Sequence, residues 1–303
     1  HHSVGTPLES QRGSRRSNRR MPRRAAVGRR SFAASLKALE ALAADGARVS
    51  VHVSDLDRGT VVFAGDDFVT LPTGGLGKVL LLIEVAAQIQ DGVLDPLEII
   101  ERASVDPVTT TGMWQHLKAP ALPVVDLAVL TAANGDALAA NALLHRVGLD
   151  AVRARAEQLG LTRVALLDRV RQTRGPDDAP QFSIGTTREL AGLFSALVNS
   201  QVVSAAVSAQ VAEWLSLNHD LSLVASGTGL NPFAHENDEH GLLFINKTGW
   251  EMGVRAEAGV LAGPRAGIAY SVIVCFDDLS IAHRLRAHDA FRTLGVDLME
   301  YVF

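Results

Sequence analysis

The chain is organised around the stretch LPTGGLGKVLLL, residues 71–82, in which a glycine-rich turn leads into a run of apolar residues. The apolar run continues from Gly77 to Ile89, which is too long for a strand and predicts a helix buried on most of its circumference. Lys78 lies in the first turn, three residues after Gly75, and residues with this spacing share a helical face. We therefore expect Gly75 and Lys78 to lie together at the entrance to a central helix.

The segments on either side of this helix predict a sheet that is interrupted by a helical block. Strands are predicted from alternating or β-branched runs at 48–54, 61–63, 242–246, 254–261 and 269–276. Amphipathic periods and stop signals predict further helices at 32–44, 124–133, 136–147, 150–159, 187–199, 203–215 and 279–301. This order predicts a mixed α/β (α+β) fold of two layers, an antiparallel sheet flanked by the terminal helices, plus an all-helical lobe.

The same order predicts how the chain divides into domains. Residues 31–72 and 220–303 are expected to form the sheet domain, and residues 73–219 the helical domain. Residues 1–30 carry nine arginines and one acid and are rich in Ser, Pro and Gly, so a disordered basic tail is expected. The first residues, His1-His2-Ser3, resemble the remnant of an affinity tag.

The amino-acid composition indicates a globular protein and argues against binding of nucleic acid. With 303 residues, of which 47% are apolar, the chain can bury a large core. The residues after position 30 hold 20 basic and 32 acidic side chains, and aromatic residues make up 5% of the chain, so the body is not expected to bind nucleic acid. The arginine-rich tail is the one segment suited to non-specific binding of polyanions.

The sequence also gives expectations about the cellular compartment. No apolar run approaches the roughly 18 residues that cross a bilayer, and the single cysteine, Cys275, excludes an internal disulfide and reads as a buried, inert thiol. We expect a cytoplasmic monomer without membrane contact. Arg29 and Arg30 resemble an export signal, and the protein is secreted if they belong to one, but charged residues interrupt the apolar region that such a signal needs.

A second motif lies far downstream. Lys247-Thr248-Gly249 follows a predicted strand that ends at Asn246. Together with Lys78 and the order of elements, it makes residues 31–303 resemble the class A serine β-lactamases and penicillin-binding proteins (DD-peptidases), of an actinobacterial type. The resemblance implies a serine β-lactamase/transpeptidase-like fold, and a family chemistry of amide hydrolysis in β-lactams or peptides.

The resemblance implies catalytic positions in the first half of the chain. The family's S-x-x-K motif falls on Gly75-Leu76-Gly77-Lys78, so Gly75 stands at the nucleophile position and only the lysine is kept. The family's S-D-N motif falls on Gly135, Asp136 and Ala137, where Asp136 alone survives and Gly135 is a ligand-binding position.

The resemblance also implies roles for the loop and for the second motif. Residues 161–184 are expected to form a long loop, in which Arg171 stands at the general-base position and Asp177 and Asp178 are candidate substitutes. We expect Arg169 to form an ion pair with one of these aspartates. The resemblance implies ligand-binding positions at Lys247, Thr248, Gly249 and Trp250, and at Arg255 on the neighbouring strand.

Three functions are compatible with this pattern. In the first, serine acylation is lost and the cleft binds a small carboxylate-bearing ligand, β-lactam or peptide-like, or acts as a non-covalent catalyst in which Lys78 is a base or an amine nucleophile. In the second, the protein is a working serine hydrolase in which Gly75 is an engineered change or another hydroxyl such as Thr73 attacks. In the third, the cleft is closed and the protein is an interaction module. Whether it is an enzyme stays open.

No metal or cofactor is expected. The histidines of residues 235–240 are five apart, which fits no zinc motif, and a solvated acidic loop is the simpler interpretation. The glycines before Lys78 do not complete a phosphate-binding loop, because Val79 stands where that motif needs Ser or Thr.

Overall fold

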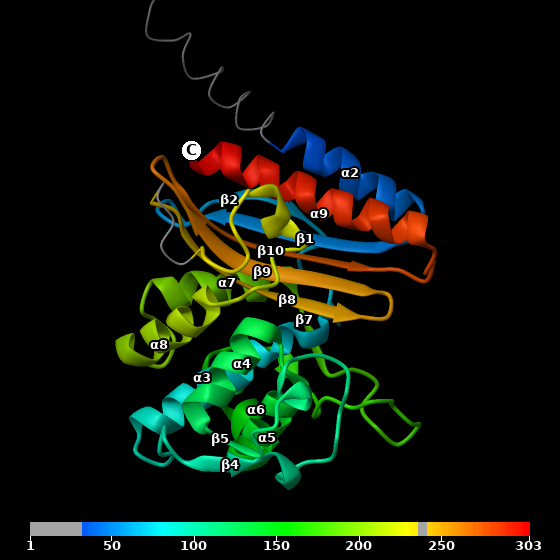
Figure 1. Cartoon of the computed structure of the whole chain (residues 1–303). Helices are drawn as coiled ribbons and strands as arrows, with labels where there is room; N and C mark the ends of the chain where they lie inside the picture. The colour runs from blue at the N-terminus through cyan, green and yellow to red at the C-terminus, as the bar shows by residue number, and fades with distance from the viewer. Residues whose placement is uncertain (1–31, 236–240) are drawn as a thin grey trace, which may run out of the picture.

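The computed structural model describes residues 32–235 and 241–303. Its largest sheet is antiparallel, with the strand order β2-β1-β10-β9-β8. Its strands are β1 (Arg48–Asp55), β2 (Val61–Gly65), β8 (Leu243–Glu251), β9 (Val254–Ala262) and β10 (Gly267–Cys275). The first strand pairs with the last, so that segments from both ends of the chain complete one sheet, as predicted (Figure 1).

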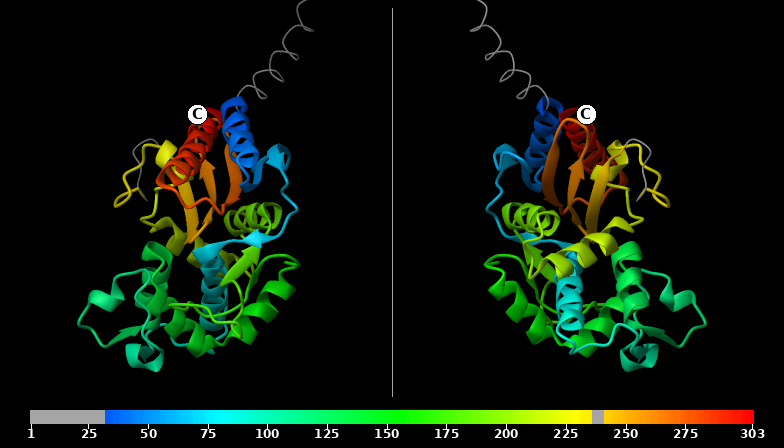
Figure 2. Two further views of the ribbon diagram at one scale, coloured as in Figure 1. Left: turned by 90° about the vertical axis from the view of Figure 1, so that its right-hand side faces the viewer. Right: turned by 90° about the vertical axis from the view of Figure 1, so that its left-hand side faces the viewer.

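The outer face of this sheet is covered by two helices from opposite ends of the chain. α2 (Ala33–Ala44) and α9 (Ile281–Val302) lie side by side across it (Figures 1 and 2). They enclose an apolar core with the sheet, which includes Leu39, Phe291 and Leu298. The buried carboxylate of Asp297 accepts a hydrogen bond from the Ser35 backbone N–H at 3.1 Å, which ties the two helices together.

The inner face of the sheet is covered by α7 (Thr187–Val198), which packs on β1, β9 and β10. One side of this helix is apolar, and Leu190, Phe194 and Leu197 are buried there. The sequence pattern places residues 187–199 in the helical domain, whereas in the structure α7 packs on the sheet, which is therefore covered on both faces.

The helical lobe is built around α3 (Lys78–Gln90), which is buried from Lys78 to Ala87. This confirms the helix predicted from the opening stretch. Packed around it are α4 (Val124–Asn134), α5 (Ala137–Val147), α6 (Leu149–Gln158) and α8 (Ala205–Ser216). Because the apolar surface of α3 faces neighbours on nearly every side, it forms the core of the lobe.

Short elements connect the larger ones. β3 (Leu71–Pro72), β7 (Ser183–Gly185) and β6 (Ala165–Leu166) form a small sheet, and β4 (Ile99–Glu101) pairs with β5 (Ala121–Pro123). Single 3₁₀ turns occupy η1 (Gly74–Gly77), η2 (Arg102–Ser104), η3 (Trp114–His116) and η4 (Val224–Gly227). The predicted loop at 161–184 thus has a short strand near each end and irregular backbone between them.

Several sequence expectations can be checked on the described part of the chain. Within 32–235 and 241–303, no helix combines the length and apolarity needed to cross a bilayer. Cys275 is buried in β10, and burial raises the pKa of its thiol to about 11. The predictions for residues 1–30, and for the acidic loop at 236–240, lie outside the described residues.

Candidate functional site

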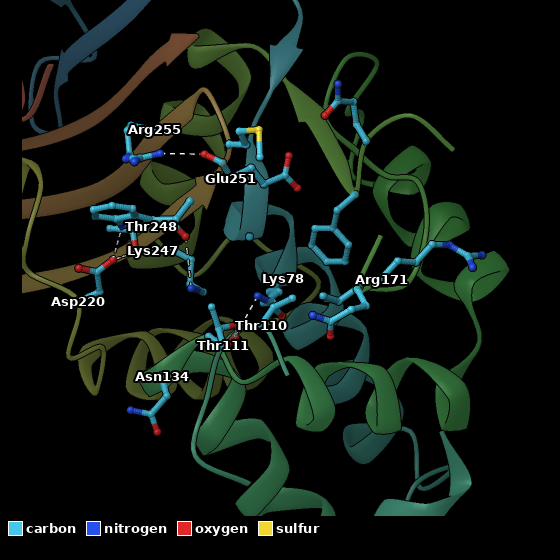
Figure 3. Close-up of a pocket in the computed structure, with 18 of the residues that line it drawn as sticks. Lys78, Thr110, Thr111, Asn134, Arg171, Asp220, Lys247, Thr248, Glu251 and Arg255 are labelled. Atoms are coloured by element: carbon cyan, nitrogen blue, oxygen red, sulfur yellow. Dashed lines mark hydrogen bonds between the residues drawn. The ribbon is translucent and has the colours of Figure 1, made fainter. Parts of the chain in front are cut away.

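A cleft of about 810 Å³ lies where β8 meets the helical lobe (Figure 3). It brings together most of the site residues inferred from the sequence. Those that line it are Gly75, Lys78, Gly135, Arg171, Lys247, Thr248, Trp250 and Arg255. Asp136 and Gly249 are not among the lining residues.

Gly75 and Lys78 have the relationship that their spacing predicted. Gly75 lies in the turn η1, directly before α3, and an ideal Cβ placed on it would lie 3.0 Å from Lys78 Nζ. Its backbone has no left-handed φ, and the nearest atom that such a Cβ meets is the end of a flexible side chain. The backbone therefore does not require glycine here, and a side chain at this position would point at the lysine.

Gly249 holds the turn η1 against β8. A Cβ on Gly249 would overlap the carbonyl oxygen of Thr73, because the two backbones pass each other in direct contact. The close contact explains why a glycine stands at position 249; its ligand-binding role stays a prediction.

Two buried ammonium groups face Gly135. Lys78 Nζ donates a hydrogen bond to the Gly135 carbonyl at 3.0 Å. An ideal Cβ on Gly135 would lie 3.6 Å from Lys247 Nζ and 3.8 Å from Lys78 Nζ. Gly135 ends α4 in the left-handed conformation, with a φ of 61°, so glycine suits this position better than a residue with a side chain.

Burial weakens the basicity of both lysines. It lowers the pKa of Lys78 to about 7, with a further contribution from the charge of Lys247, while Asp136 and Glu251 oppose the shift. Burial also lowers the pKa of Lys247 to about 8, against the attraction of Asp220. A fraction of each amine is consequently uncharged near neutral pH.

Asp220 is a cleft residue that the sequence analysis does not single out. Its carboxylate accepts a hydrogen bond from Thr248 Oγ1 at 2.5 Å and one from the Trp250 indole N–H at 2.9 Å (Figure 3). The hydroxyl predicted to bind a ligand carboxylate is therefore already bonded to a carboxylate of the protein itself. No motif marks Asp220 in the sequence, because only the tertiary fold brings the segment after α8 beside β8.

Arg255 supports the cleft wall. Its Nη1 donates to the carbonyl oxygens of Glu251 and Val254, each at 2.8 Å. Its guanidinium lies 4.1 Å from the centre of the Trp250 ring, within the range of a cation–π contact. Arg255 lines the cleft, with Nη1 bonded to backbone, and its approach to a ligand carboxylate stays a prediction.

Arg171 is fixed in an ion-pair cluster on the opposite side of the cleft from Asp220 (Figure 3). Asp168 accepts from Arg171 Nε at 2.6 Å and from Arg174 Nη1 at 2.7 Å, and Asp178 lies 3.3 Å from Arg171 Nη1. The Arg171 and Arg174 hydrogen bonds hold the pKa of Asp168 below its ordinary value, against the effect of burial. This cluster shapes the loop at 161–184.

The predicted ion pair of Arg169 with Asp177 or Asp178 is wrong. Arg169 Nη1 instead lies 2.9 Å from Asp106, on the segment that faces the loop. Asp177 and Asp178 do not line the cleft, so neither is placed to activate a water beside Gly75. The error arose because several arginines share the loop and spacing alone does not decide which one reaches a given carboxylate.

Asp136 has a different environment from the one inferred. Its carboxylate accepts from the backbone N–H of Ala139 at 2.9 Å, capping α5, and from those of Met113 and Trp114 at 2.8 Å. These bonds explain why an acid is buried here: its carboxylate holds the start of α5 and the backbone of Met113 and Trp114 in place next to the cleft. We assign it a positioning role.

Glu251 was also missed. It lines the cleft from β8, on the same strand face as Lys247, because side chains two apart alternate back to one face. Burial raises the pKa of its carboxyl, while Arg174 and Lys78 oppose the rise. The cleft therefore contains an acid that holds its proton more strongly than an exposed glutamate.

Thr73 is not placed to replace a serine at position 75. Thr73 is buried, with 1% of the residue exposed, and its hydroxyl is hydrogen-bonded to Ser183 Oγ. It does not line the cleft.

Comparison with known proteins supplies a family for this fold. A family model described as "Beta-lactamase enzyme family" matches residues 31–302. Among solved structures, a β-lactamase from Sphaerobacter thermophilus DSM 20745 is 20% identical with a TM-score of 0.76, covering 88% of this chain and 96% of that one. PBP-A is 15% identical with a TM-score of 0.72, covering 88% and 94%.

A third solved structure is a mutant of the class A β-lactamase inferred for the last common ancestor of Gram-negative bacteria. It is 21% identical with a TM-score of 0.72, and the match covers 89% of this chain and 98% of that one. No curated protein sequence matches the chain. At these identities the solved structures establish the fold.

Proposed function

Because the chain belongs to the β-lactamase enzyme family and has its fold, we propose that it is a member without serine acylation, which binds a small carboxylate-bearing ligand in the cleft beside Lys78 and Lys247. The ligand would be β-lactam-like or peptide-like. The proposal has a negative part, the missing nucleophile, and a positive part, the retained cations.

The negative part is supported by three positions. Gly75 has no side chain to attack a carbonyl, and Gly135 has no hydroxyl to pass a proton to a leaving group. The third is Arg171, which contributes a guanidinium bound to Asp168 in place of a carboxylate base. Since such groups act together, loss of the nucleophile alone removes most of the rate.

The positive part is supported by one observation above the others: the two buried amines converge on Gly135, inside an open cleft. An anion between them would offset the repulsion of two charges in a poorly solvated site. Loss of the catalytic side chains thus leaves a pair of cations suited to hold a carboxylate.

Binding of penicillin G tests the proposal directly, with affinity measured by calorimetry. We expect Lys247→Met to weaken binding about tenfold or more, since a charge-assisted hydrogen bond contributes about 1.5–3 kcal/mol. Lys118→Met is the matched control, because Lys118 is exposed and does not line the cleft. Equal affinity of the Lys247 variant and the control would contradict the proposed site.

The pH dependence of the same measurement has a definite sign. The pKa values of Lys78 and Lys247 are lowered to about 7 and about 8, so both amines are mostly charged below pH 7 and mostly neutral above pH 8. The penicillin carboxylate stays ionised throughout this range. We therefore expect affinity to fall as pH rises from about 6 to about 9, and an affinity that rises would be incompatible with anion binding by these lysines.

Replacing Asp220 tests whether its carboxylate competes with the carboxylate of a ligand for the same part of the cleft. Asp220 holds the Thr248 hydroxyl and the Trp250 N–H and adds a negative charge where an anion would bind. We expect Asp220→Asn to tighten penicillin G binding several-fold, because the amide keeps the shape without the charge. Calorimetry gives the answer, and weaker binding would mean that the carboxylate assists the ligand instead of opposing it.

A further inference from the structure

The amine of Lys78 has the surroundings of a nucleophile rather than those of a paired cation. Its described hydrogen bond is to the Gly135 carbonyl, at 3.0 Å. A neutral amine that donates one N–H in this way keeps its lone pair.

Because residue 75 is a glycine, no side chain from this position fills the space next to the Lys78 amine. An ideal Cβ at Gly75 would lie 3.0 Å from Lys78 Nζ, so the volume that a serine would fill is open to a ligand atom within reach of the nitrogen. A small carbonyl group in this space would sit at the distance from which an amine attacks.

Burial and the neighbouring charge of Lys247 favour the neutral form of the Lys78 amine, against the opposing effect of two acids. Lys247 reaches from β8 toward Gly135, the residue whose carbonyl Lys78 contacts. A nearby cation and burial together lower the pKa of a lysine, which makes its amine nucleophilic. The acids that act on Lys78 from the surrounding elements are Asp136 at the start of α5 and Glu251 on β8. The remaining charged residues of the cleft are Asp220, Arg171, Arg174 and Arg255.

We propose that Lys78 is itself a nucleophile, and that it forms a reversible imine with a small aldehyde or keto acid whose carboxylate is held by Lys247. This inference rests on the proposed function, because it uses the same cleft and the same anion contact. It adds the substrate class, an oxo acid, and a covalent step that does not need a serine.

Formation of the imine needs no oxidant or second reactant and releases one water. The lone pair of Lys78 Nζ forms a bond to the carbonyl carbon, the π electron pair of the carbonyl moves to its oxygen, and one of the two amine protons passes to that oxygen to give a neutral carbinolamine. The nitrogen then loses a proton, the carbon–oxygen bond breaks, and one water leaves as the carbon–nitrogen double bond forms. Water, to which the cleft is open, carries each proton from nitrogen to oxygen. Addition of water reverses the sequence.

The composition of the chain makes this step easy to test, because it has four lysines: Lys37, Lys78, Lys118 and Lys247. Lys37 and Lys118 are exposed and lie outside the cleft. The full chain would be incubated with glyoxylate and cyanoborohydride, which reduces an imine to a stable secondary amine, and the modified lysines identified by peptide mass mapping. We expect Lys78 to be modified at least tenfold faster than Lys37 and Lys118.

Two outcomes would overturn the inference: equal modification of all four lysines, or modification of Lys247 with Lys78 untouched. The mapping uses the unaltered sequence, so it does not depend on a variant that fails to fold. Lys78→Arg then adds a second check, since it keeps a charge and should abolish the cleft adduct while the exposed lysines react as before.

The failure of this inference can be separated from the failure of the proposed function. If penicillin G binds in a manner that depends on Lys247 while glyoxylate leaves Lys78 unmodified, the imine is excluded and the binding function stands. If Lys78 is modified and penicillin G does not bind, the proposed β-lactam-like or peptide-like ligand is wrong, and the oxo-acid ligand remains.

Discussion

Gly75→Ser is expected to form a covalent penicillin adduct, which the proposed function predicts to be absent from the unaltered chain. The ideal Cβ direction at Gly75 points at Lys78 Nζ, 3.0 Å away, so a serine hydroxyl there would lie within reach of an amine whose pKa is lowered to about 7. Such an amine is partly neutral at pH 7 and can accept the hydroxyl proton. A fluorescent penicillin and intact-mass measurement would detect the adduct.

The matched control is Gly75→Ala, which adds the same Cβ without the hydroxyl and should form no adduct. If Arg171 stands at the general-base position, as the family resemblance implies, and since neither Asp177 nor Asp178 lines the cleft, the serine adduct should be released slowly. A Gly75→Ser protein that stays unlabelled would mean that the cleft differs from an acylating one by more than this side chain. An adduct on the unaltered chain would contradict the proposed loss of acylation.

Gly249→Ala is expected to destabilise the fold by about 3 kcal/mol, the upper part of the usual range for overpacking. The added methyl would overlap the carbonyl oxygen of Thr73, and both partners are backbone, so no side chain can rotate away. Relief requires η1 to move off β8, which also separates Gly75 and Lys78 from Lys247. Denaturant unfolding gives the free energy, and penicillin G calorimetry should show weaker binding.

Gly192→Ala is the matched control for this substitution. Gly192 is exposed within α7, and a Cβ on it would meet no atom within 4 Å. Alanine is favoured over glycine inside a helix by about 1 kcal/mol, so this variant should be slightly more stable than the parent. If Gly249→Ala were as stable as Gly192→Ala, the contact between η1 and β8 would not be tight in solution.

The fold was largely predictable because its elements carry strong local patterns. The apolar run that became α3 and the alternation that became β1 both depend on neighbouring residues alone. The strand β8 was predicted to end at Asn246, yet it continues to Glu251, because its polar residues Lys247 and Thr248 face a cleft. A polar residue in such a strand looks like a loop residue until the cleft is known.

The site was predictable only where spacing along one element decides it. Gly75 and Lys78 share one turn, and Lys247 and Thr248 share one strand, so motif spacing located them. Asp220 was missed because it comes from a different segment and meets Thr248 through tertiary packing. The partners of Arg169 and Arg171 were uncertain for the same reason, since ion-pair choice within a loop follows from the path of its backbone.

The pairing of Arg48 with Cys275, at one end of the β1–β10 register, has a consequence for how the protein is made. During synthesis β1 leaves the ribosome long before β10 exists, and its hydrogen-bonding edge must stay uncommitted while the helical lobe emerges. Closing so large a loop is slow and leaves a strand edge open to wrong partners. Because one wall of the cleft is β8, the binding site can form only in the last stage of folding, after almost the entire chain has been translated.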